Sequence, residues 1–174
     1  GIDSVRTFTS IEAALKDPER VYSLDLSGQK LKELPVEVFQ FKNLNALKLG
    51  HNRLKEVPAR IAELKYLQEF GASRNRFTKF PEVICKLVHL KRLDLSRNQI
   101  DGLPACLGDL SELISLDLWS NELGVFPPEL EKLKALRFLD LRVISFSEAE
   151  IGRIKELLPW VKIWLSQPCN CGEE

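Results

Sequence analysis

Short stretches of alternating apolar and polar residues return along this chain at a constant interval. In residues 90–104, LKRLDLSRNQIDGLP, leucines alternate with polar residues, the alternation stops at Asn98, and the stretch ends on Leu103 and Pro104. Alternation with a period of two is typical of a strand with one buried face. The stretch therefore predicts a short strand followed by a turn that contains asparagine.

The same pattern recurs every 23 residues. The strand motif is found at residues 24–26, 47–49, 70–72, 93–95, 116–118 and 139–141, and asparagine keeps the same step at Asn52, Asn75, Asn98 and Asn121. A unit of this size cannot bury its apolar residues alone, so the repeats are expected to stack on one another. Because an amide side chain carries both donors and acceptors, we expect the asparagines to form a structural ladder of hydrogen bonds between neighbouring turns.

These columns resemble the leucine-rich repeat family, with its consensus LxxLxLxxNxLxxLPxxIxxLxxL. The match is to the 23-residue LP variety found in bacterial proteins and in Ras-binding scaffold proteins of animals, and it covers about residues 21–146. The resemblance implies an α/β solenoid, a curved right-handed coil with a parallel sheet of about seven strands on the concave face and short helical turns on the convex face. It also implies that binding usually occurs on the concave face.

The two ends of the chain depart from the repeat and are expected to cap it. Residues 1–22 form an N-terminal helical cap, with a capping box at Ser10 and a helix over residues 10–16. Residues 23–146 are the repeats. In residues 147–165, Ser147 and Glu150 form a second capping box, a helix runs up to Pro159, and a last strand follows. Residues 166–174 are a tail, and the whole chain is one domain.

Composition narrows the possible partners. Lysine and arginine number 25 and aspartate and glutamate 25 among 174 residues, so no overall field favours a nucleic acid. No apolar run approaches the length that a bilayer requires, so no membrane insertion is expected. The chain is expected to be monomeric. Its compartment stays open between the cytoplasm and a secreted or periplasmic location reached by loss of a signal peptide.

The four cysteines divide into two pairs. Cys85 and Cys106 fall on the outer turns of successive repeats, where they are expected to be free thiols. Cys169 and Cys171 resemble the start of the disulfide-bonded C-terminal cap of extracellular leucine-rich repeat proteins, although the later cysteines of that cap are missing. Their oxidation state stays open, and two thiolates alone are too few for a typical zinc site.

Catalysis has no support in the sequence. His51 and His89 are the only histidines and fall in different columns, and no nucleophile stands at a recognisable spacing from a base. We therefore expect no enzyme activity, no cofactor and no metal.

Charged residues form one feature of the predicted concave face. Asp94, Asp117 and Asp140 share a column, and like charges on neighbouring strands repel one another. The interpretation we favour is a surface ion-pair network that offsets this repulsion, and the alternative is a bound cation or a cationic partner. The network would use four arginines, Arg92, Arg97, Arg137 and Arg142.

Aromatic residues form the second feature. Trp119, Phe138, Trp160 and Trp164 are expected to project from the last strands, and exposed aromatics beside arginine are typical of binding hot spots. For Trp160 and Trp164 the alternative is that they cover the end of the solenoid. The candidate partner-binding residues are Trp119, Phe138, Arg142, Arg97, Arg74, Arg92, Arg137, Asp117, Asp94, Trp160 and Trp164.

The sequence thus predicts a non-enzymatic module that recognises a protein or peptide on its concave face. Two alternatives remain. One is a receptor for a glycan or small ligand that uses the aromatic patch, and the other is a structural spacer of a larger protein.

Overall fold

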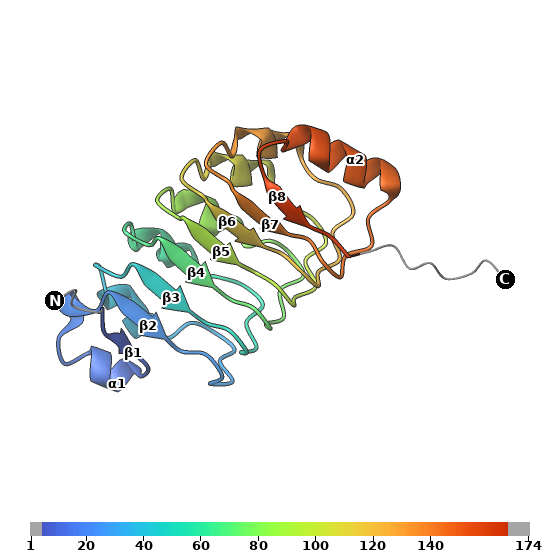
Figure 1. The fold of residues 1–174 in the computed structure, drawn as a ribbon. Helices are drawn as coiled ribbons and strands as arrows, with labels where there is room; N and C mark the ends of the chain where they lie inside the picture. Colours follow the sequence, from blue (N-terminus) through green and yellow to red (C-terminus); the bar gives the residue numbers. More distant parts are fainter. Residues whose placement is uncertain (1–4, 167–174) are drawn as a thin grey trace.

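A computed structural model describes residues 5–166 of the chain and has one parallel sheet in this range. The strands follow one another in chain order, so each pairs with the strand of the preceding and the following repeat (Figure 1). They are β1 (Thr7–Phe8), β2 (Ser23–Asp25), β3 (Ala46–Lys48), β4 (Glu69–Gly71), β5 (Arg92–Asp94), β6 (Ser115–Asp117), β7 (Phe138–Asp140) and β8 (Lys162–Trp164). This is the curved α/β solenoid that the sequence predicts.

Short 3-10 helices take the chain back behind the sheet in each repeat. Every one of the five inside the repeats follows a proline, whose fixed φ and missing N–H suit the residue before or at the start of a helical turn. Their bounds are η2 (Val36–Gln40), η3 (Ala59–Glu63), η4 (Glu82–Lys86), η5 (Ala105–Asp109) and η6 (Pro128–Lys132).

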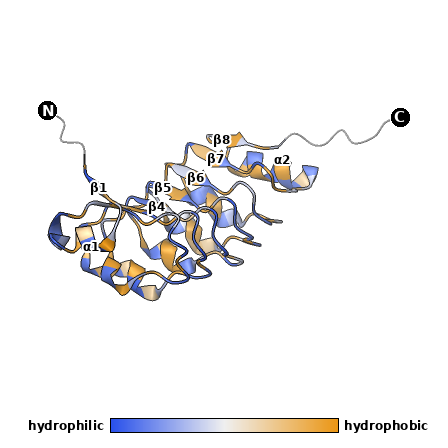
Figure 2. Ribbon diagram, turned by 90° about the horizontal axis from the view of Figure 1, so that it is seen from below, coloured by the Kyte–Doolittle hydropathy of each residue, from blue (hydrophilic) through white to orange (hydrophobic). Residues whose placement is uncertain are grey.

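The core lies between the sheet and these helical turns. In the repeat that starts at Leu93, six of the seven apolar residues that recur along the chain are buried, and Leu103 is partly buried against them. Figure 2 shows hydrophobic and hydrophilic residues alternating along the repeats instead of gathering in one apolar segment. Each repeat therefore buries its leucines only against its neighbours, as expected for a solenoid.

The asparagine column joins the turns of adjacent repeats. The backbone N–H of Phe77 donates to Asn98 Oδ1 (3.2 Å), and Asn98 Nδ2 donates to the carbonyl oxygen of Ala72 (3.0 Å), 26 residues earlier. Asn52, Asn75 and Asn121 bond in the same way. Because Asn98 is only 7% exposed, its bonds satisfy backbone groups that water does not reach.

The residue before each asparagine has a left-handed backbone. Arg97, for example, has a φ of 54°, and Val143 has one of 56° in the corresponding position. This conformation turns the chain at the end of each strand. It is strained for most residues and most of all for a β-branched one such as Val143.

The N-terminal cap differs in detail from the prediction. Its helix α1 is Ile11–Ala14, shorter than residues 10–16, and the Ser10 side chain caps it by accepting from the N–H of Ala13 (3.2 Å). A further 3-10 helix, η1, follows at Pro18–Arg20. The sequence did not predict β1, which pairs with β2 and brings the sheet to eight strands in the described chain.

The C-terminal cap is a longer helix, α2 (Glu148–Leu157), followed by β8. The Ser147 hydroxyl accepts from the N–H of Glu150 (3.1 Å), as in a capping box. The Glu150 side chain does not close the box. It accepts instead from the N–H of Phe126 (2.8 Å), and this bond holds α2 against the preceding repeat. Within α2, the Glu150 carboxylate also pairs with Arg153 (2.8 Å).

Cys85 and Cys106 form a disulfide bond, so the expectation of two free thiols is wrong. The two residues are 21 positions apart, two short of the repeat length, and belong to different columns. Stacking of η4 on η5 nevertheless brings their Cα atoms to 5.7 Å, within the normal range for a disulfide. Cys169 and Cys171 lie outside the described residues.

Candidate functional site on the concave sheet face

Side chains at alternate strand positions face away from the core and line the concave face of the sheet. Most of the candidate residues of the last four strands gather on one part of it, which we call the C-terminal concave patch. It consists of Asp94, Arg97, Asp117, Trp119, Phe138, Asp140, Arg142 and Trp164.

The three aspartates stand side by side in the centre of the patch. Asp94 is in register with Asp117, and Asp117 with Asp140. Each carboxylate accepts a hydrogen bond from the backbone N–H two residues further on, at 3.0 Å, 3.3 Å and 3.1 Å respectively. These backbone bonds offset part of the repulsion between the carboxylates.

Asp117, in the middle of the column, is the most perturbed of the three. Burial raises its pKa to about 7, with the negative charges of Asp94 and Asp140 adding to the rise and the Trp119 N–H opposing it. This pKa lies above the ordinary value of 3.8, so the folded state holds the proton more tightly than the unfolded chain does. The contribution of Asp117 to stability is therefore fully present below about pH 4 and is lost as the pH rises through about 7.

Of the four arginines that were expected to form ion pairs with the aspartates, only one does so. Arg142 pairs with Asp140 (2.7 Å). Arg97 lies over the ring of Trp119 at 5.3 Å, and Arg137 donates to the carbonyl oxygens of its own repeat. Among residues 5–166, neither Arg97, Arg137 nor Arg92 is within salt-bridge distance of a carboxylate.

The aromatic residues form two clusters: Trp119 and Phe138 lie on opposite sides of the aspartate column, and Trp164, in register with Asp140, stands at its end. Trp119 lies under Arg97, and Phe138 stacks on Trp164 with ring centroids 5.8 Å apart. Phe138 is in register with Ser115, four positions before Trp119, which corresponds to about 13 Å along the strand direction. Phe138 is 45% exposed, although it is a large apolar side chain. The patch thus offers two aromatic anchor points with a band of carboxylates between them.

Trp160 and Arg74 do not belong to this patch. Trp160 lies in the turn before β8, where its indole N–H donates to the carbonyl oxygen of Leu133 (3.3 Å) and Lys134 lies over its ring (4.2 Å). The expectation that it projects from the last strand is wrong. Arg74 follows β4, two strands away from Trp119.

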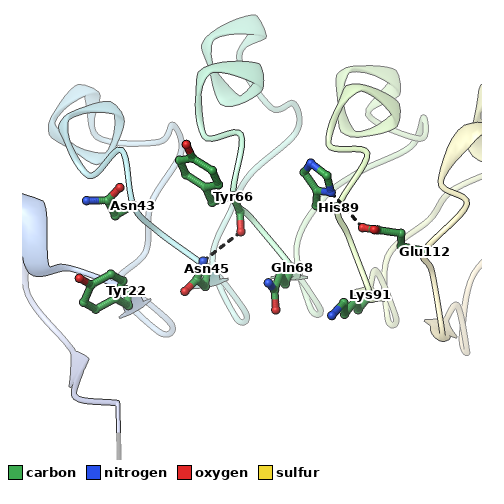
Figure 3. Close-up of a pocket in the computed structure, with 8 residues that line it drawn as sticks. All are labelled: Tyr22, Asn43, Asn45, Tyr66, Gln68, His89, Lys91 and Glu112. Atoms are coloured by element: carbon green, nitrogen blue, oxygen red, sulfur yellow. Dashed lines mark hydrogen bonds and ion pairs between the residues drawn. The ribbon is translucent and has the colours of Figure 1, made fainter.

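A second concave feature, which the sequence did not predict, lies at the edge of the sheet where β2 to β6 begin. Here a shallow pocket of about 500 Å³ is lined by Tyr22, Asn43, Asn45, Tyr66, Gln68, His89, Lys91 and Glu112 (Figure 3). These residues form two columns with the 23-residue step, one at position 22 and its equivalents and one at position 43 and its equivalents. The step is visible in the sequence, but the sequence does not show that the two columns share one groove.

The residues that the structure describes contain neither a cluster of metal-ligating side chains nor a membrane-spanning helix. Within residues 5–166, no three histidine, cysteine, aspartate or glutamate side chains are grouped to hold a metal ion, and His89 pairs with Glu112 (3.0 Å). In the same range no helix has the length and apolar character needed to cross a bilayer.

The chain belongs to the leucine-rich repeat family. The family model described as "Leucine rich repeat" matches residues 19–77, 65–123 and 88–142, which together cover most of the chain. Proteins of this family are typically non-enzymatic modules that recognise other proteins. No curated protein matches the sequence.

Three solved structures illustrate the similarity. A leucine-rich repeat protein of Leptospira interrogans is 30% identical, with a TM-score of 0.71, over 92% of this chain and 48% of that one. Internalin C2 of Listeria monocytogenes is 21% identical (TM-score 0.72) over 94% of this chain and 69% of that one, a likeness of fold alone. The plant peptide hormone receptor RGFR1, in complex with RGF2, is 26% identical (TM-score 0.63) over 92% of this chain and 30% of that one. The chain thus spans about half the length of the Leptospira protein.

Proposed function

We propose that this chain is a non-enzymatic recognition module that binds an extended polypeptide segment on the C-terminal concave patch. The observation that carries the proposal is the exposure of Phe138, which stacks on Trp164 on one side of the aspartate column while Trp119 lies under Arg97 on the other. Tryptophan, tyrosine and arginine carry much of the binding energy of protein interfaces, and the aromatic side chains do so because they bury a large area.

The spacing of the two aromatic clusters favours an extended segment. Two anchor points about 13 Å apart match side chains four residues apart in an extended chain, at about 3.3 Å per residue. The partner would place one side chain against Trp119 and another against Phe138, with its backbone over the aspartates. The plant receptor RGFR1, which shares the fold, forms a complex with RGF2 and is named a peptide hormone receptor.

The disulfide between Cys85 and Cys106 supports a role in an oxidising compartment. Disulfides persist in secreted and periplasmic proteins and are rare in the cytosol of most organisms. A partner would then be met outside the reducing cytosol.

Selection from a random peptide library displayed on phage tests the proposal. We expect selected peptides to bind the purified protein and to lose at least tenfold in affinity to the Trp119→Ala/Phe138→Ala variant, measured by fluorescence anisotropy. The matched control is Tyr66→Ala, which removes an exposed aromatic side chain outside the patch and should leave this affinity unchanged.

Thermal unfolding of the same variants separates loss of contact from loss of fold. Because Phe138 is 45% exposed and does not belong to the buried core, the double variant should melt close to the wild-type temperature. Selected peptides that bind the double variant as tightly as the wild type would contradict the proposed site.

A further inference from the structure

The pocket at the edge of the sheet is separate from the C-terminal concave patch. It lies where β2 to β6 begin, whereas the aromatic residues of the patch lie within or just after β6, β7 and β8. Its residues stand in two parallel rows, with Tyr22, Asn45, Gln68 and Lys91 in one and Asn43, Tyr66, His89 and Glu112 in the other (Figure 3). The groove between the rows is shallow, and it runs along the solenoid across successive repeats.

The groove combines exposed aromatic rings with amide side chains. Tyr22 is 42% exposed and Tyr66 58% exposed, although both are large side chains that would ordinarily gain from burial. Asn45 Nδ2 donates to the carbonyl oxygen of Tyr66 (3.1 Å), which leaves its Oδ1 directed away from that bond. Among the residues drawn in Figure 3, no hydrogen bond involves the side chains of Tyr22, Gln68 or Lys91.

The charge of the groove does not match a polyanion or a polycation. Lys91 and Glu112 carry opposite formal charges, and Glu112 is already paired with His89 at 3.0 Å. No aliphatic side chain lines the groove, so it also offers little to a lipid tail or to an apolar peptide side chain. The lining instead suits a neutral ligand that combines flat C–H faces with hydroxyl groups that both donate and accept hydrogen bonds.

The spacing of the rows distinguishes between an oligosaccharide and a peptide. Neighbouring strands, and with them neighbouring lining residues, are about 4.8 Å apart. An extended peptide presents side chains to one side every ~6.6 Å and would lose register with the rows after two repeats. A chain of linked pyranose rings advances by a step close to the strand spacing, so each sugar can meet the same pair of columns.

From this geometry we propose that the edge groove is a binding site for a neutral oligosaccharide of about four sugar units. The rings of Tyr22 and Tyr66 stand in opposite rows and are separated along the solenoid by two repeats, about 10 Å, so they stack on alternate sugars. Asn45, in the repeat between them, and Gln68, in the repeat of Tyr66, bond to the hydroxyl groups. This site does not depend on the polypeptide site, because the two surfaces have no residue in common.

Titration of the full chain with soluble oligosaccharides tests the site. The probes are cellulose-, chitin- and starch-derived oligomers of two to six sugars. Their binding is measured by calorimetry and by the shifts of backbone amide NMR signals. We expect at least one series to bind, with an affinity that rises up to the tetrasaccharide and then levels off. The shifts should fall on residues 43–45, 66–68 and 89–91. No binding in any of the three series at about 10 mM would overturn the proposal.

Three variants link the binding to the groove. Tyr66→Ala should weaken binding at least tenfold, whereas Tyr66→Phe keeps the ring and should stay within about threefold of the wild type. Trp119→Ala should leave sugar binding unchanged. The proposal fails if Tyr66→Ala binds as well as the wild type or if Trp119→Ala abolishes the binding. It also fails if peptides selected on the wild-type protein lose affinity to Tyr66→Ala, since the groove would then belong to the polypeptide site.

Discussion

Replacing Asn98 by alanine removes one step of the asparagine ladder. Asn98 makes one bond as an acceptor, from the N–H of Phe77, and donates to the carbonyl oxygens of Ala72, Leu95 and Ser96 at 3.0 to 3.2 Å. All three carbonyl oxygens keep a second donor, namely Asn75, Asn121 and the N–H of Arg74 respectively. Alanine therefore leaves one buried group, the Phe77 N–H, without its partner.

The expected cost follows from this count. A buried N–H without a partner costs about 1 to 3 kcal/mol. Loss of the other bonds and of the volume of the amide brings the destabilisation to about 2 to 4 kcal/mol. The matched control is Asn43→Ala, because Asn43 is only half-buried and makes a single side-chain bond, to the carbonyl oxygen of Glu19 at the surface (2.8 Å). That change should cost less than about 1 kcal/mol.

Urea unfolding followed by tryptophan fluorescence and circular dichroism measures both variants. A stability change with an unaltered slope appears as a shift of the midpoint. If Asn98→Ala shifts the midpoint no more than Asn43→Ala, the ladder does not hold adjacent repeats together and the reasoning is refuted.

Two further changes test the outer face and the concave face. The Cys85→Ala/Cys106→Ala variant should lose up to about 3 kcal/mol, the chain entropy of a closed loop of this size, and dithiothreitol should lower the urea midpoint of the wild type but not of the variant. Equal wild-type midpoints with and without the reductant would contradict this. Asp117→Asn should remove the decline in stability that Asp117 causes between about pH 4 and pH 7. The free energy of unfolding of the variant minus that of the wild type should therefore be more positive at pH 8 than at pH 5. A constant difference between the two proteins would show that the Asp117 carboxyl does not titrate in this range.

The fold could be predicted because every repeat carries the same pattern of apolar residues and asparagine. The buried leucines and the asparagine column recur at the same step, so a single exception such as Ala72 does not obscure the pattern. β1 could not be predicted in this way. It is two residues long and has no repeat before it, and it is a strand only because the edge of β2 is there to pair with it.

Trp160 shows why the last repeat was harder to predict. Paired strand residues of the earlier repeats are 23 positions apart, as with Leu116 and Leu139, but Leu139 pairs with Ile163, 24 positions further on. The last strand therefore begins only at Lys162, and Trp160 falls in the turn before it, where it packs against the end of the core. Covering the end of the solenoid was the alternative interpretation of this residue.

Which side chains pair with each other cannot be predicted from the 23-residue repeat alone, because it depends on the direction in which each side chain points. The sequence places Arg97 and Arg137 near the aspartates, yet the first lies over Trp119 and the second bonds to backbone carbonyl oxygens. The disulfide depends in the same way on the stacking of η4 on η5, and the edge pocket on two columns lying side by side.

The central claim is that polypeptide recognition occurs on the concave face of the sheet, over β5 to β8. It is tested most directly by mapping a peptide selected on the wild-type protein through changes in its backbone amide NMR signals. The account predicts that the largest changes fall on residues 94–97, 117–119, 138–142 and 162–164. Changes concentrated on the 3-10 helices η4, η5 and η6 would place recognition on the convex face and contradict it.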